Sequence, residues 1–182
     1  MTPRSQGGGG LYERLGINMA ALGCVMLDAD PLDVHDMFPE SFWYYGDLPG
    51  RRTGGPAPET HVTLLFGLLE NGHVWREHID EVLDGWTAPA VIEIREFGVF
   101  PGQGYDVVVG HVHNANELRD AHNRLSRLPH INTFPYRPHV TVGYVHPGVG
   151  QFMLPTLERT VAAQPARTIQ VVTRELNYGD QP

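Results

Sequence analysis

Two copies of one short pattern, His-apolar-Thr-apolar, most constrain how this chain folds. The copies are His61-Val62-Thr63-Leu64 and His139-Val140-Thr141-Val142, and their histidines are 139 − 61 = 78 positions apart. Each copy lies in a run of Val, Leu and aromatic residues, which favours an extended strand. Side chains alternate along a strand, so the histidine and the threonine of each copy share one face and the valines point into a core. We therefore expect two strands that each present an imidazole beside a hydroxyl.

The remainder of the chain alternates between predicted strands and helices in two halves, each of which contains one copy. Further strands are expected at residues 19–27, 89–97, 106–112 and 168–176, with a Gly/Pro turn at 97–105. Helices are expected at residues 31–43, 74–86, 114–128 and 152–163. Asn114 or Asn116 is expected to cap the third of these helices. This order predicts a mixed α+β protein.

Composition favours a single globular domain. The chain has 182 residues, 41% of them hydrophobic, and we expect one domain over residues 11–182 behind a flexible tail at 1–10 that ends in four glycines. No apolar run is long enough to cross a membrane and no signal segment is visible, so we expect a soluble, cytoplasmic protein with no membrane partner. Cys24 is the only cysteine and is expected to be a small buried hydrophobe.

The charge argues against long nucleic acids as partners. Thirteen basic residues, all arginine, face 21 acidic ones, for a formal charge of −8, whereas proteins that hold long nucleic acid usually carry a basic surface. A small nucleotide or a short oligonucleotide fits this charge better. Arg51 and Arg52 lie in a Gly/Pro-rich loop directly before the first copy, where they are either solvated or contact a phosphate.

Two histidines that face one site can divide acid–base work, because an imidazole accepts or donates a proton near neutral pH. Phosphodiester cleavage needs this combination: a nucleophilic hydroxyl or water loses a proton, and the departing oxygen gains one. Thr63 and Thr141 can donate hydrogen bonds to the non-bridging phosphate oxygens. This chemistry requires no metal and no cofactor.

Two other kinds of site are possible from the residues. His111 and His113 would share a strand face, and Asp106 or Asp120 could complete a metal site with them, but no His-Glu-x-x-His pattern is present. A Ser-His-Asp hydrolase is disfavoured because no serine lies in a Gly-x-Ser-x-Gly turn.

The two copies resemble the paired signatures of the two-histidine (2H) phosphoesterases, which include bacterial RNA 2′,5′ ligase-like proteins and cyclic phosphodiesterases. Residues 97–101 ahead of a strand, residues 117–122 in a helix and Pro138 before the second histidine agree with this resemblance, which spans roughly residues 22–145. It implies an α+β, two-lobed 2H phosphoesterase fold, with antiparallel sheets facing a central cleft and helices outside.

The resemblance also implies an activity. The chain would be a phosphoric diester hydrolase that cleaves 2′,3′-cyclic phosphates, 2′,5′ linkages or cyclic oligonucleotides without metal, with His61 and His139 as the acid–base pair and Thr63 and Thr141 as phosphate-oxygen donors. In one version it resembles the phage members of the family that degrade cyclic oligonucleotide signals of host defence, and it would then act in the host cytoplasm. A protein that binds nucleotides without turnover, or a purely structural one, is the alternative from another class. The oligomeric state is not predicted.

Many relatives carry a basic residue shortly after one signature, where this chain has Phe66 and Tyr144. This departure suggests more contact with a base and less with phosphate charge. The candidates for phosphate contact are Arg51, Arg52 and Arg137, and those for stacking on a base are Phe100, Tyr105, Tyr136 and Tyr144.

Overall fold

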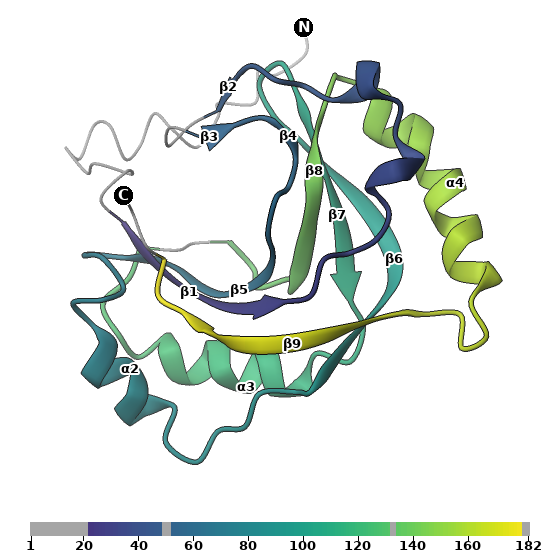
Figure 1. The fold of residues 1–182 in the computed structure, drawn as a ribbon. Coiled ribbons are helices and arrows are strands. Elements are labelled where there is room, and N and C mark those ends of the chain that lie inside the picture. Colours follow the sequence, from purple (N-terminus) through teal and green to yellow (C-terminus); the bar gives the residue numbers. More distant parts are fainter. Residues whose placement is uncertain (1–21, 49–51, 132–133, 180–182) are drawn as a thin grey trace, which may run out of the picture.

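The computed structural model describes residues 22–48, 52–131 and 134–179 (Figure 1). The predicted tail at residues 1–10 and Arg51 lie outside these residues. The long strands are β1 (Gly23–Ala29), β5 (Thr60–Leu68), β6 (Val91–Pro101), β7 (Asp106–Val112), β8 (His139–Val145) and β9 (Ile169–Asn177). The short strands are β2 (Asp47–Leu48), β3 (Arg52–Thr53) and β4 (Gly55–Pro56). The helices are α2 (Arg76–Val82), α3 (Asn116–Leu125) and α4 (Val149–Ala163).

One large antiparallel sheet joins both halves of the chain. Its strand order is β4-β8-β5-β1-β9-β6-β7, and β8 also pairs with β7. Strand β9 holds the two halves together, because its first residues pair with β6 and its last residues pair with β1. The two strands that carry the His-x-Thr copies, β5 and β8, are neighbours in this sheet. The predicted α+β class with antiparallel pairing is confirmed.

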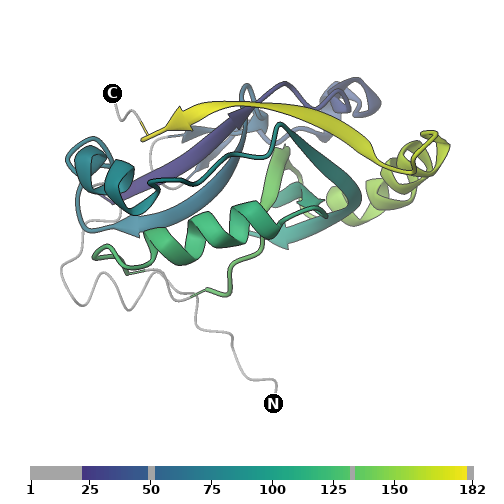
Figure 2. The ribbon, with the colours of Figure 1, turned by 90° about the horizontal axis from the view of Figure 1, so that it is seen from below.

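The helices cover the face of the sheet that points away from the His-x-Thr side chains. Helix α3 packs on β5, and α4 packs on β6 and β7 (Figures 1 and 2). Helix α3 buries Leu118, Ala121 and Leu125 in the same apolar core as Val62 and Val140. Burial of these side chains is the main source of stability for such an arrangement. The opposite face of β5 and β8 is left to the polar residues of the two copies.

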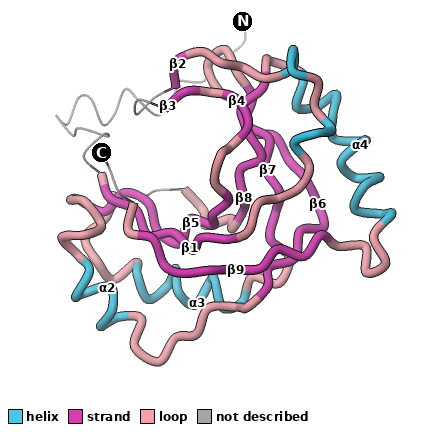
Figure 3. Tube along the Cα trace, viewed as in Figure 1, coloured by secondary structure: helices cyan, strands magenta, loops and turns pink. Residues whose placement is uncertain are grey.

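Three local predictions are wrong. Residues 31–43 do not form one helix but two short 3₁₀ turns, η2 (His35–Met37) and η3 (Glu40–Phe42), within a long connection (Figure 3). Strand β6 continues to Pro101, through residues expected to form a turn, because these residues pair with β7 as far as Asp106. The loop predicted before β5 contains the short strands β2, β3 and β4.

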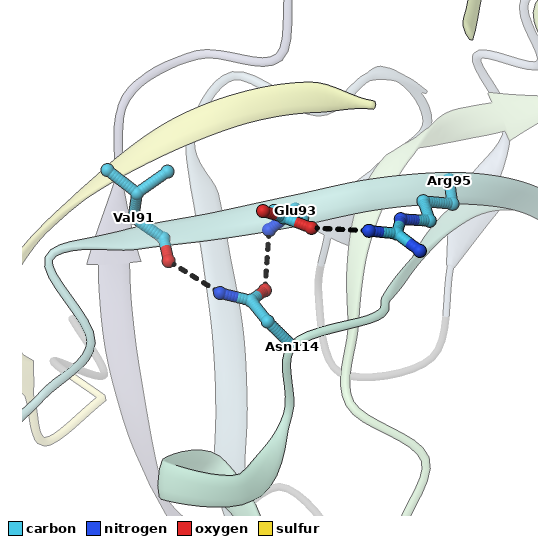
Figure 4. A network of polar contacts seen from close by, with 4 residues as sticks. All are labelled: Val91, Glu93, Arg95 and Asn114. Carbon is cyan, nitrogen blue, oxygen red and sulfur yellow. Dashed lines mark hydrogen bonds and ion pairs between the residues drawn. The ribbon is translucent and has the colours of Figure 1, made fainter. Parts of the chain in front are cut away.

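A fourth error concerns Asn114, which does not cap the helix that follows it. Its side-chain Nδ2 donates to the Val91 carbonyl at 2.9 Å, and its Oδ1 accepts from the Glu93 amide at 2.7 Å (Figure 4). The helix begins after Ala115, with no side-chain capping bond. The Asn114 amide thus supplies β6 with the donor and acceptor that a neighbouring strand would otherwise provide. None of the described helices is both long and apolar enough to span a membrane.

Candidate active site

The pairing of β5 with β8 brings the two copies together. Val62 lies opposite Val140 in this antiparallel pair, and both valines are fully buried. Their neighbours along each strand therefore point to the other face, with His61 opposite Thr141 and Thr63 opposite His139. The two imidazoles occupy diagonal corners of this four-residue group, and such positions are separated by about 7–8 Å. We call the face that carries these four side chains the motif face.

The orientation of the His139 ring is set by the chain just before it. Its Nδ1 lies 2.7 Å from the Arg137 carbonyl oxygen. A carbonyl oxygen can only accept, so Nδ1 carries a hydrogen and donates it. The proton that the neutral ring can take up then goes to Nε2. This bond holds the His139 ring in one tautomer.

A third imidazole lies beside His139 on the same face. His111 is directly opposite His139 in the β7–β8 pair. Its ring lies against the backbone of Gly98, where a Cβ atom would be only 2.5 Å from Nε2. The ring of Phe100 contacts both imidazoles edge-on, with centroid distances of 5.1 Å to His139 and 6.2 Å to His111. Gly98 therefore makes room for an imidazole that stands next to that of His139.

The surroundings of His111 favour its neutral form. Burial lowers the pKa of this imidazole, and the nearby His139 and Arg137 lower it further, whereas Glu96 has the opposite effect. The sequence placed His111 only in a possible metal site and missed its position beside His139. The position of His111 follows from the pairing of β7 with β8. This pairing joins residues 28 positions apart in the chain, and the sequence of neither strand alone predicts it.

The metal alternative does not assemble around His111. Asp106 is on the other face of β7, where its Oδ2 accepts from the Gly148 amide at 2.7 Å. Asp120 forms an ion pair with Arg124 at 3.0 Å on α3. Within residues 22–48, 52–131 and 134–179, no three His, Cys, Asp or Glu side chains are grouped so that they could hold a metal ion.

Three of the predicted base-stacking residues lie with the motif face. Tyr144 is opposite Val107 in the β7–β8 pair, and Val107 is in turn opposite Phe100 in the β6–β7 pair. The Tyr105 and Tyr144 ring centroids are 5.9 Å apart. The ring of Tyr44, which the sequence did not single out, lies 5.5 Å from that of Tyr105. Burial and the two other tyrosines raise the pKa of Tyr105, so its phenol is uncharged at neutral pH.

Tyr136 lies elsewhere. Its ring stacks on His122 of helix α3, with centroids 4.0 Å apart and planes 2° from parallel. The Nδ1 of His122 donates to the Leu64 carbonyl at 2.8 Å, which attaches this pair to the helix-covered side of β5. Burial also raises the pKa of the Tyr136 phenol well above its ordinary value. The expectation that Tyr136 contacts a base therefore does not fit its position, and we leave it out of the proposed substrate contacts.

Of the three candidate arginines, Arg52 and Arg137 lie within the described residues. Arg137 is exposed, its carbonyl orients His139, and its positive charge acts on His111. Arg52 contributes backbone to β3, which pairs with β2 through Leu48. Arg51 is outside the described residues. Arg137 is thus the arginine that the geometry places near the motif face.

Comparison with known proteins gives a family and a similar fold for this chain. A family model described as the 2′-5′ RNA ligase superfamily matches residues 51–174. Among solved structures, the chain is similar to Usb1 of Kluyveromyces marxianus, with a TM-score of 0.51 and 11% identity over 88% of this chain and 94% of that one. A structure of the same protein with uridine monophosphate matches with a TM-score of 0.50 and 10% identity, over 88% and 98% of the two chains. No curated protein sequence matches the chain.

Proposed function

Because the chain belongs to the 2′-5′ RNA ligase superfamily, we propose that it is a metal-independent phosphodiesterase that acts on a small nucleotide phosphodiester. The observation that carries this proposal is the pairing of Val62 with Val140, which sets two imidazoles and two hydroxyls around one point. The family and the Usb1 fold support phosphodiester chemistry. The Usb1 structure that holds uridine monophosphate supports a nucleotide-sized substrate.

The two histidines have different neighbours, which suggests different roles. His61 lies opposite Asp28 in the β1–β5 pair, so the residue across from it on β1 carries a carboxylate. His139 lies opposite another imidazole, His111, and its Nε2 is the nitrogen that accepts a proton. We assign His139 as the general base that takes the proton of the attacking hydroxyl or water. His61 is then the general acid that protonates the departing oxygen.

The threonines complete the reaction site. In the transition state negative charge accumulates on the non-bridging phosphate oxygens, and donors aimed at these oxygens lower the barrier. The hydroxyls of Thr63 and Thr141 lie across from His139 and His61, so each phosphate oxygen between the strands has a donor within reach. Arg137 adds a positive charge at the edge of this group.

Purified protein in EDTA, offered 2′,3′-cyclic nucleotides, 2′,5′-linked oligoadenylate and cyclic di- and trinucleotides, tests the proposal. We expect turnover of at least one class and a loss of about 10²- to 10⁴-fold in kcat after His139→Ala or His61→Ala. The matched control is His113→Ala, an exposed histidine that follows the end of β7, which should retain full activity. A wild type inactive on every substrate, or equal activity in all three variants, contradicts the proposal. Mass spectrometry of the products identifies the bond that is cleaved.

A further inference from the structure

Strand β5 has an irregularity directly after its threonine. Thr63 is opposite Met26 of β1, and Leu65 is opposite the next residue, Val25. Leu64 is therefore an extra residue, as in a β-bulge, and both Leu64 and Leu65 are buried. The bulge shifts the alternation of the strand by one position.

Strand β8 has the same irregularity at the equivalent position. Thr141 is opposite Val109 of β7, and Gly143 is opposite Val108. Val142 is the extra residue here, and both Val142 and Gly143 are buried. Both copies therefore contain one additional residue immediately after the threonine, although they pair with different strands.

The two bulges re-aim one aromatic side chain each. Phe66 and Tyr144 both follow their histidine by five residues, and in a regular strand an odd spacing would place them on the opposite face, in the core. The extra residue returns each of them to the face of its histidine. Phe66 is accordingly 42% exposed although it lies between buried Leu65 and Gly67, and Tyr144 is half-buried.

The antiparallel direction of β5 and β8 sends these aromatics to opposite sides of the His/Thr group. The chain runs from Thr63 to Phe66 in one direction and from Thr141 to Tyr144 in the other. With the bulge counted out, each aromatic is two strand positions, or about 7 Å, from its threonine. A phosphate at the centre would thus have an aromatic ring on either side, each at a distance that the sugar of a nucleotide can span.

We propose that Phe66 and Tyr144 are stacking platforms for two nucleobases, so that the substrate of this site is a phosphodiester that links two nucleosides. This inference rests on the proposed function and narrows it. A nucleoside 2′,3′-cyclic phosphate has one nucleoside at the reacting phosphorus and would use one platform. A 2′,5′- or 3′,5′-linked dinucleotide, linear or cyclic, would use both. Aromatic stacking is tolerant of base identity, so both platforms accept more than one base.

The platforms differ in their surroundings. Tyr144 lies against Tyr105, which contacts Tyr44, so one base meets the edge of a tyrosine cluster. Phe66 is opposite Cys24 of β1 and is among the exposed large apolar side chains of the described residues. A base at Phe66 would stack on this exposed ring.

The test compares wild type with Phe66→Leu and Tyr144→Leu on three substrates: 2′,5′-adenylyl-adenosine and its two analogues that lack one base. Phe152→Leu, which changes an aromatic on α4 that is 70% exposed, is the matched control. We expect each platform substitution to lower kcat/KM on the complete dinucleotide by about 10-fold, a typical loss for one stacked base. On each abasic analogue only one of the two substitutions should have an effect, and the control should match wild type throughout. Thermal unfolding confirms that the variants are folded.

Dinucleotide binding, measured by calorimetry on the same proteins, separates this inference from the proposed function. If the protein turns over the dinucleotide and neither Phe66→Leu nor Tyr144→Leu changes the rate, the stacking proposal is wrong and the proposed phosphodiesterase activity is retained. Binding that both substitutions weaken, without any turnover, would overturn the phosphodiesterase and support the platforms. Neither binding nor turnover would overturn both.

Discussion

Strands β5 and β8 carry the same arrangement of side chains but pair with different neighbouring strands. Each presents a histidine, a threonine and, after a bulge, an aromatic ring on one face. Strand β5 borders β1 and puts His61 opposite Asp28, whose carboxylate accepts from Asn177 Nδ2 at 3.2 Å. Strand β8 borders β7 and puts His139 opposite His111. A shared motif thus acquires two electrostatic settings from the strands beside it.

This difference teaches that near-identical segments can take complementary roles without any change in the segments themselves. A carboxylate lies across from one imidazole, and a second imidazole lies across from the other. In the proposed mechanism, Asp28 and His111, which lie outside both copies, are the neighbours that distinguish acid from base. The acid and base roles can be told apart with a substrate whose cleavage needs only one of them.

The largest expected effect comes from changing the leaving group. A nucleoside 3′-(p-nitrophenyl) phosphate releases a phenolate that leaves without a proton, so it does not need the general acid. His61→Ala should therefore recover most of its lost activity on this substrate, whereas His139→Ala should remain about 10²- to 10⁴-fold below wild type. Steady-state kcat/KM on the aryl ester and on a dinucleotide gives both ratios. Recovery by His139→Ala instead would exchange the two roles.

An intermediate effect is expected from Gly98→Ala, which disturbs His111 beside His139 and leaves the surroundings of His61 unchanged. The added methyl would be 2.5 Å from Nε2 of His111, so the ring must move from its place beside His139 and Phe100. We expect a several-fold loss of kcat and a loss of about 1 kcal/mol of stability, the lower end for overpacking, since a side chain rather than backbone gives way. Chemical denaturation and kinetics measure the two losses.

The double variant Gly98→Ala/His111→Ala is the control for that substitution. Once the ring is gone, the alanine at position 98 should cost no further stability beyond His111→Ala alone. If the double variant instead loses as much stability as the two single variants added together, the glycine is needed for another reason, and His111 is not the group that it accommodates.

The parts of the fold that follow from local pattern were predicted well. Strands β5, β7, β8 and β9 and helices α3 and α4 lie within a few residues of their expected ranges, because alternation and helical spacing are local properties. The short elements between β1 and β5 were missed, since two-residue strands exist only through their partners. The same reason explains the error at Asn114, whose hydrogen bonds go to a strand 21 and 23 residues away.

The candidate site was predictable only in part. The four His and Thr candidates could be named because the sequence of each copy is itself a recognisable pattern. Their mutual placement, the bulges at Leu64 and Val142 and the position of His111 depend on the register between strands far apart in sequence, which periodicity does not determine. Tyr136 was misplaced for a related reason: it is close to His139 in the chain, but its ring packs on α3.

The smallest expected effect is a pH dependence of the free energy of unfolding that comes from His111. Burial, with help from His139 and Arg137 and against Glu96, lowers the pKa of His111 below its ordinary 6.5. The unfolded chain therefore binds a proton at this residue at a pH where the folded protein does not, and stability falls as the pH drops below about 6.5. His111→Asn should reduce the slope of the unfolding free energy between pH 7 and 5, measured by urea denaturation. The exposed His113→Asn is the matched control, and parallel curves for all three proteins would show that His111 is not held neutral by its neighbours.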